Sequence, residues 1–112
     1  MSISTHPTVK VVNASEVDYA AGVRAWTEDA RDLYRVTMQV VWANYTGVTV
    51  KLQGTLDNMT WADLPGMAVS TSGNIVSGEI GPYEQIGVHV TGTLSGGVDT
   101  LKVYLKRSRL QR

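Results

Sequence analysis

Apolar and polar residues alternate over most of the chain from residue 35 onward. Successive side chains of a β-strand point to opposite faces, so this pattern predicts strands with one buried and one exposed face. The alternation is clearest over residues 35–42, 48–53, 86–91 and 101–106. The apolar positions of these segments, which we expect in the core, are Val36, Met38, Val40 and Trp42, then Val48, Val50 and Leu52, then Ile86, Val88 and Val90, and finally Leu101, Val103 and Leu105.

Short connections rich in turn-forming residues separate these segments. Residues 44–47, Asn-Tyr-Thr-Gly, join the first two segments, and residues 95–97, Ser-Gly-Gly, lie between the last two. Connections of this length are typical of antiparallel hairpins. The pattern therefore predicts two hairpins, one over residues 35–53 and one over residues 86–106.

Weaker strand patterns occupy residues 59–64 and 74–80, and an early strand over residues 8–12 is expected to add to a sheet edge. A series of about six to eight short strands, with turn signals every 8 to 12 residues or so, is typical of an all-β antiparallel sandwich. We expect a β-sandwich of jelly-roll or immunoglobulin-like type. The pattern leaves the strand order open.

Residues 13–34 interrupt the alternation. Thr27 precedes Glu28 and Asp29, which is the arrangement of an N-cap followed by acidic residues in a first helical turn. The sequence therefore predicts at most one short helical turn, over residues 28–32. The alternative is that residues 13–34 form a long loop, or an arm that reaches a neighbouring subunit.

The length of 112 residues is that of one domain, so we expect a single β-sandwich over residues 1–112. Residues 1–7 are expected to be flexible. The chain has no cysteine, so its stability must come from a packed core or from association with other chains. It contains no apolar run near the roughly 18 residues that cross a bilayer, and its N-terminus lacks the apolar stretch of a signal peptide. We expect no membrane partner and no export by its own signal.

The formal net charge is zero, but the charges are unevenly distributed along the chain. Residues 1–101 hold all ten acidic and five basic residues, and residues 102–112 hold the other five basic ones. An acidic body would repel a polyanion, so nucleic acid is not an expected partner. The basic C-terminal tail, residues 106–112, instead favours contact between the tail and the body of another subunit. The alternative is a tail that is merely solvated.

Candidate catalytic groups are sparse. His6 and His89 have no cysteine or carboxylate at ligand spacing beside them, and no nucleophile elbow of the form G-x-S-x-G occurs. Asp57 and Asp63 flank Trp61 and could contribute to a calcium site, but such a site needs about six oxygen ligands. We therefore expect no enzyme activity, no cofactor and no metal.

The aromatic residues are where a binding role would show. Trp61 follows the turn at residues 57–58, where it could be exposed as a platform for a sugar ring or buried as the anchor of a strand. Met59 and Trp61 fall on one face of the alternation, and two large apolar residues predict that this face is core. Tyr104 lies on a polar face between two lysines, so it is the best single candidate for an interface or ligand contact.

The run YRVTMQVVWANYTGVTVKLQGTLDNMTWADLPG, from Tyr34 to Gly66, together with IGVHVTGT and LKVYLKR, resembles small β-sandwich structural proteins of tailed bacteriophages. Their recurrent pattern is a strand like VQVVW, a glycine turn, a strand like LKLQ, a turn close to S-N-D-G-T-T-W, and a final strand after a glycine-rich turn. Here Asp57-Asn58 stands where Asp-Gly is usual, and Met59 replaces a small polar residue. Within this group, the chain most resembles the capsid decoration, or staple, proteins of epsilon15-like podoviruses, which are jelly-roll proteins clamped onto the outside of the shell.

The resemblance implies a noncatalytic virion protein that is made in the host cytoplasm and stabilises the capsid from its surface. Its partners would be the major capsid protein and further copies of itself, as a homodimer or another homo-oligomer. It would bind the shell through one sheet edge and two arms, residues 13–34 and 106–112. The interface residues that we predict on this basis are Trp26, Arg31, Tyr104, Lys106, Arg107 and Arg109.

Two other functions stay open at the level of the sequence. The element of a turn followed by tryptophan also occurs in discoidin-like carbohydrate-binding sandwiches, so the chain could be a carbohydrate-binding module of a phage tail or fibre protein. Trp61 or Tyr104 would then be the stacking platform. The same fold could also serve as a tail or head-completion component.

Overall fold

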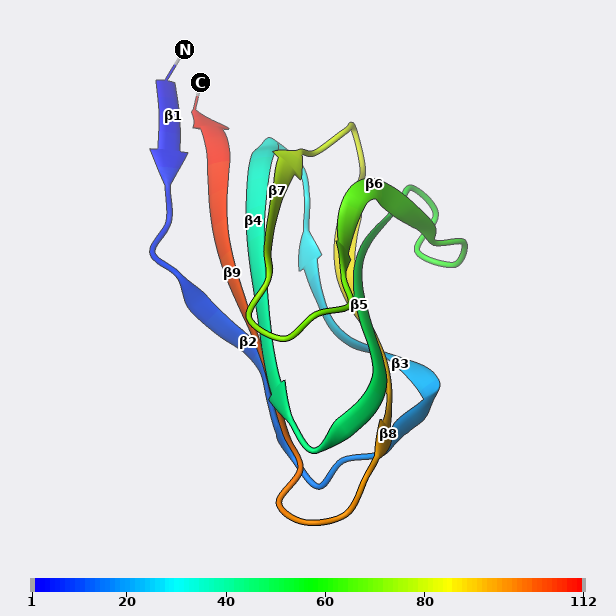
Figure 1. Ribbon diagram of the computed structural model, residues 1–112. Helices are drawn as coiled ribbons and strands as arrows, with labels where there is room; N and C mark the ends of the chain where they lie inside the picture. The colour runs from blue at the N-terminus through cyan, green and yellow to red at the C-terminus, as the bar shows by residue number, and fades with distance from the viewer. Residues whose placement is uncertain (1, 112) are drawn as a thin grey trace.

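The strands extend over nearly the whole length of the chain. Within residues 2–111, which the computed structural model describes, nine β-strands follow one another and no helix occurs (Figure 1). The strands are β1 (Ser2–Thr5), β2 (Val9–Ser15), β3 (Tyr19–Asp29), β4 (Leu33–Ala43), β5 (Tyr45–Thr55), β6 (Ala62–Val69), β7 (Ile75–Glu79), β8 (Gln85–Leu94) and β9 (Thr100–Gln111). In this part of the chain no helix could therefore cross a membrane.

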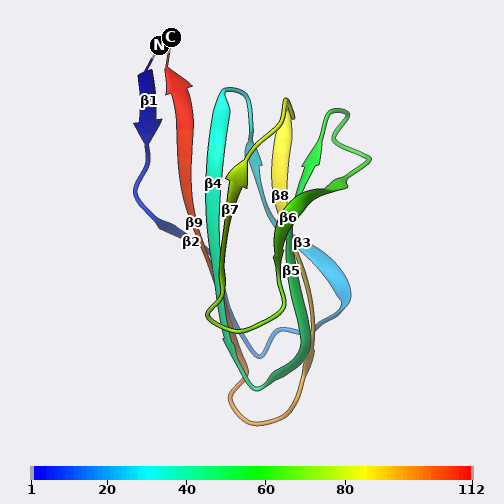
Figure 2. The ribbon, with the colours of Figure 1, turned by 45° about the horizontal axis from the view of Figure 1, so that its top comes forward.

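The strands form two antiparallel sheets that pack face to face (Figure 2). The larger sheet has the order β1-β9-β4-β7, and β2 pairs with the same strand β9 as β1 does. The smaller sheet has the order β3-β8-β5-β6. This arrangement confirms the predicted all-β antiparallel sandwich. The number of strands exceeds the expected six to eight because residues 2–5 and 19–29 are also strands.

The two predicted hairpins are wrong, because each pair of consecutive strands is divided between the sheets. β4 belongs to the larger sheet and β5 to the smaller one, and β8 and β9 are divided in the same way. Asn44, with φ 62°, lies in the tight connection between β4 and β5. An alternation of apolar and polar residues is the same for strands that lie side by side and for strands that face each other across a core. The connection length alone did not separate these two cases.

The predicted core residues do fill the space between the sheets. Val36, Met38 and Val40 of β4 are fully buried, as are the apolar positions of β8 and β9, and those of β5 are nearly so. Trp42 is half-buried and packs against this core. The apolar face of each alternating segment is therefore the inner face of its sheet, as the pattern predicted.

The early strand predicted over residues 8–12 is β2, which pairs with β9 at a sheet edge as expected. The weaker strands predicted over residues 59–64 and 74–80 correspond to β6 and β7. The start of β6 lies three residues later than predicted, at Ala62.

The helical turn predicted over residues 28–32 is wrong, because β3 continues to Asp29 and pairs with β8 over most of its length. The register of this pairing shifts twice, between Tyr19 and Val23 and between Arg24 and Trp26. Each shift breaks the period-two pattern that identifies a strand in a sequence. Residues 19–29 are thus an edge strand of the smaller sheet and not an arm.

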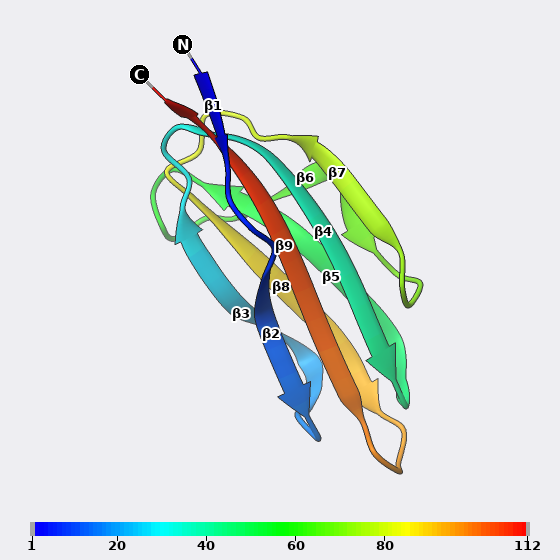
Figure 3. The same cartoon turned by 90° about the vertical axis from the view of Figure 1, so that its left-hand side faces the viewer.

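Both ends of the described chain are paired strands rather than the flexible segment and the tail that we expected. β1 pairs with the end of β9, so that Ser2 lies opposite Gln111 and Thr5 lies opposite Ser108. The same part of β9 pairs with β4 on its other side. Residues 1 and 112 lie outside the described residues. Figure 3 shows β1 and β2 following each other along one edge of β9.

Candidate functional site

The outer face of the larger sheet gathers basic side chains from three strands. Residues that lie directly opposite each other in an antiparallel pair point to the same face. Lys10 of β2 is opposite Tyr104 of β9, and Arg35 of β4 is opposite Ser108. Because β9 alternates, Lys102 and Lys106 share the face of Tyr104. We call Lys10, Arg35, Lys102, Tyr104 and Lys106 the basic face.

The charges of the basic face are largely uncompensated. None of the ion pairs found within residues 2–111 involves its four cations. Glu79 of β7 is the one described carboxylate that the strand register brings to this face, opposite Arg35. The Nζ atom of Lys10 lies 5.7 Å from the centre of the Tyr104 ring, and Arg35 donates through Nε to the hydroxyl of Ser77 over 3.2 Å. A chain of zero net charge thus presents a surface that carries four cations and one carboxylate.

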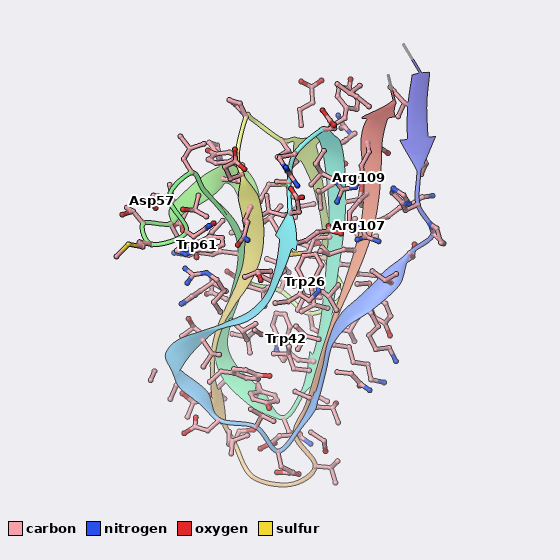
Figure 4. All side chains as sticks on the ribbon, turned by 180° about the vertical axis from the view of Figure 1, so that it is seen from behind. Trp26, Trp42, Asp57, Trp61, Arg107 and Arg109 are labelled. Atoms are coloured by element: carbon pink, nitrogen blue, oxygen red, sulfur yellow. The ribbon has the colours of Figure 1, made fainter. Side chains whose placement is uncertain are left out.

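The next two arginines of β9 point in the opposite direction, into the edge of the sandwich. Arg107 donates through Nη1 to Oε2 of Glu28 on β3. Nη2 of Arg109 lies 3.4 Å from the same oxygen, and Arg109 also donates to the backbone carbonyls of Asp29 and Arg31. We call Glu28, Arg107 and Arg109 the clasp, because they connect the two sheets where β9 and β3 face each other (Figure 4).

The six predicted interface residues therefore separate into distinct environments. Tyr104 and Lys106 lie on the basic face, whereas Arg107 and Arg109 belong to the clasp. Trp26 is half-buried against the core, opposite Val88. Arg31 lies in the turn after β3.

Arg31 forms an exposed ion pair, with its Nη2 atom 2.7 Å from Oδ2 of Asp29. Hydrogen bonds from the side chain and the backbone N–H of Arg31 lower the pKa of Asp29 to about 2. This contact occupies the guanidinium of Arg31. The side chain of Arg31 therefore does not join the basic face, although its backbone carbonyl accepts a hydrogen bond from Arg109 of the clasp.

From the sequence we did not predict that Lys10, Arg35 and Lys102 belong to the basic face. The order Lys102-x-Tyr104-x-Lys106 was a visible signal for one strand, because alternate residues share a face. Lys10 and Arg35 join this row only through the pairing of β2 and β4 with β9. A pairing between residues so far apart in the sequence leaves no local pattern.

Trp61 is not a core residue, which corrects our expectation. Met59 is 85% exposed, and Trp61 is half-buried on the outer face of the smaller sheet. Asp63 lies opposite Gln53, whose side chain points outward, and Trp61 is two residues before Asp63 and therefore on the same outer face. The residue that points inward is Leu64. The apolar face that we assigned to residues 59–64 was therefore assigned with the wrong parity.

The indole of Trp61 is held in place by Arg24 and Gly87. The guanidinium carbon of Arg24 lies 3.9 Å from the centre of the indole ring. A Cβ atom at Gly87 would lie only 3.0 Å from Cζ3 of Trp61, so the absence of a side chain at Gly87 makes room for the indole. Arg24 also donates through Nη2 to Oε1 of Gln53 over 2.9 Å. One face of the ring is thus occupied, which leaves less of it for a sugar to stack on.

The polar groups around Trp61 are bonded mainly to one another. Gln53 donates to Asp63 over 2.7 Å and Lys51 donates to the same carboxylate over 3.1 Å, and these bonds lower the pKa of Asp63. Burial, followed by the positive charges of Arg24 and Lys51, lowers the pKa of His89. This face therefore presents a closed network rather than free ligand-binding groups.

The two carboxylates considered for calcium do not converge. Asp57 accepts hydrogen bonds through Oδ1 from the backbone N–H groups of Met59 and Thr60, which lower its pKa to about 2. Asp63 is engaged by Gln53 and Lys51. Over residues 2–111, no group of three or more acidic or histidine side chains is arranged to hold a metal ion.

We expect Trp61→Ala to lower the free energy of unfolding by about 1–2 kcal/mol, since it removes a partly exposed cation–π contact. Trp26→Ala, which removes an indole packed against the core, should cost about 3 kcal/mol or more. Urea unfolding monitored by circular dichroism measures both changes. An equal loss in the two variants would mean that Trp61 is as important to packing as a core residue.

Open depressions lie on either side of Tyr83, at one end of the sandwich. The smaller, of about 290 Å³, is lined by Gly54, Ala62 and the loop between β5 and β6. The larger, of about 580 Å³, lies between the turn after β3 and the loop before β8. Their walls are mostly apolar and bring together no catalytic constellation among the described residues. The basic face is the stronger candidate for a functional surface.

Two packed antiparallel sheets with this topology define the chain as a β-sandwich domain. The fold is similar to that in the crystal structure of the SPBc2 prophage-derived protein YomS, with a TM-score of 0.64 over 95% of this chain and 96% of that chain. The two sequences are 9% identical, so the similarity concerns the fold alone. No protein-family model and no curated protein sequence matches the chain.

Proposed function

We propose that the protein is a noncatalytic structural protein of a bacteriophage virion, and more specifically a capsid decoration protein that binds the outer surface of the shell. The observation that carries the proposal is the basic face, a broad surface with four cations that have no ion-pair partner among the described residues. The similarity of the fold to a prophage-derived protein supports a phage origin. The partner would be the major capsid protein.

A face suits this role better than the arms and the sheet edge that the sequence led us to expect. Residues 106–111 are part of β9, and residues 19–29 are part of β3. The two edge strands of the smaller sheet are also poor templates for pairing, because β6 contains Pro65 and Gly66, with φ 72° at the glycine, and β3 is bulged. Proline and bulges prevent the regular pairing of a further strand.

The energetics of decoration require no catalytic group. A protein that binds only the assembled shell stabilises it by mass action. At a free concentration about 100 times the Kd, each occupied site gains about 2.7 kcal/mol. Many copies on one particle multiply this modest contribution, so a flat and partly polar contact is sufficient.

The role is tested on particles of the phage that encodes the protein. Particles that lack it are expected to release their DNA at a lower temperature than complete ones, and added purified protein should restore the difference. Release is followed with a DNA-binding dye during heating. Equal release temperatures for stripped and complete particles would refute a stabilising role. Binding to host polysaccharide without binding to the shell would indicate a carbohydrate-binding module instead.

A further inference from the structure

Exposed apolar side chains lie among the charges of the basic face. Ile75 of β7 is 59% exposed and Val41 of β4 is 39% exposed. The strand register places Ile75 opposite Gln39, in the same row as Tyr104, and Val41 opposite Lys102. The outer face of the larger sheet therefore combines an aromatic ring and two aliphatic side chains with four cations.

We propose that the outer face of the larger sheet, comprising the basic face with Val41 and Ile75, docks onto a protein surface in which carboxylates surround an apolar patch. This proposal rests on the proposed function, since the shell is the surface that would carry this patch. Protein interfaces commonly combine apolar and aromatic contacts with a polar rim. Here Val41, Ile75 and Tyr104 would supply the contact area, and the lysines would supply charge complementarity.

The same features favour a protein over a nucleic acid as the occupant. A nucleic acid is bound through its phosphates and through stacking of bases on free aromatic faces. Lys10 lies over the ring of Tyr104, so this ring is not a free face for base stacking. The side chains of Val41 and Ile75 have no charge and no hydrogen-bond donor with which to bind a phosphate. Carboxylates such as Asp57 and Asp63 lie on the side of the smaller sheet, where they would repel a long polyanion.

Four variants separate the charged and apolar parts of the contact from general surface effects. Lys102→Glu combined with Lys106→Glu reverses the charge of the face, and Ile75→Asp places a carboxylate at its apolar edge. Arg31→Glu is the charge control, because Arg31 is exposed and lies outside the face. Met59→Asp is the apolar control, since Met59 is 85% exposed and lies between β5 and β6 of the smaller sheet, away from the proposed docking face. Circular dichroism melting establishes that each variant is folded.

Binding to stripped particles is measured by co-sedimentation at several salt concentrations, with a 20-mer DNA duplex as the competing probe. We expect the charge-reversed protein to bind the shell at least about tenfold more weakly, with a smaller salt dependence. Ile75→Asp should also weaken binding, and part of the loss should remain at high salt, because salt screens the repulsion of the new carboxylate but does not restore the apolar contact. Both controls should bind like the unmodified protein.

The outcomes distinguish this inference from the proposed function. If the unmodified protein does not bind the shell, both fail. If it binds the shell and the face variants bind equally well, the inference is wrong and the decoration role stands. Tight binding to the DNA duplex that the lysine variants abolish would identify a nucleic-acid surface and overturn the inference. Sedimentation of the free protein as an oligomer that these variants dissociate would show that the face binds another copy of the chain.

Discussion

Glu28→Ala is expected to lower the free energy of unfolding by about 3–5 kcal/mol, because it leaves two arginines of the clasp without their carboxylate partner in a largely desolvated site. The side chains of Glu28 and Arg107 are only 17% and 14% exposed. Oε1 of Glu28 and Nε of Arg107 are buried without a hydrogen-bond partner. Each charge therefore depends on the other for compensation, and removal of one is costly.

Equilibrium unfolding in urea measures this change. The matched control is Asp63→Ala, which breaks the ion pair between Asp63 and Lys51. The side chains of that pair are 54% and 40% exposed, so water replaces the lost partner and the change should be much smaller. A loss in Glu28→Ala no greater than that in Asp63→Ala would show that the clasp does not contribute to stability.

Leu105→Ala is expected to destabilise the fold by about 3–4 kcal/mol, because it removes methyl groups from a fully packed region and leaves a cavity. Leu105 is fully buried and lies opposite Met38, which is also fully buried. The measurement is the midpoint of thermal unfolding, combined with urea unfolding for the free energy.

Val41→Ala is the control for Leu105→Ala, since Val41 lies on the outer face of the same sheet and is 39% exposed. A surface substitution of this kind should change stability by about 0.5 kcal/mol or less. Equal stability of the two variants would contradict the burial of Leu105 on the inner face and the exposure of Val41 on the outer face of the larger sheet.

The sequence predicted which residues form the core but not how the strands are connected. Period-two alternation identified the inward positions of β4, β5, β8 and β9, because burial of one face acts on every residue of a strand. It did not show that the connection after Ala43 crosses from one sheet to the other. β3 escaped detection because its two register shifts remove the period by which a strand is recognised.

The alternation along β9 also indicates which side chains near its end point into the sandwich. Leu101, Val103 and Leu105 point inward, and the same period continued by two and four residues places Arg107 and Arg109 inward as well. We instead expected residues 106–112 to form a flexible tail, which has no parity. Charge at the end of a chain suggests a free arm, whereas part of this charge, on Arg107 and Arg109, connects the two sheets.

The pairing of β1 with the end of β9 gives the domain a single point of attachment. Ser2 lies opposite Gln111, and β1 and the end of β9 lie side by side at one end of the long axis in Figure 1. A peptide or protein joined to either end would therefore leave the domain from the same pole, beside the outer face of the larger sheet and not through it. Fusion partners could therefore be joined to the N-terminal or the C-terminal strand, and a short linker that connects these two strands would allow circular permutation.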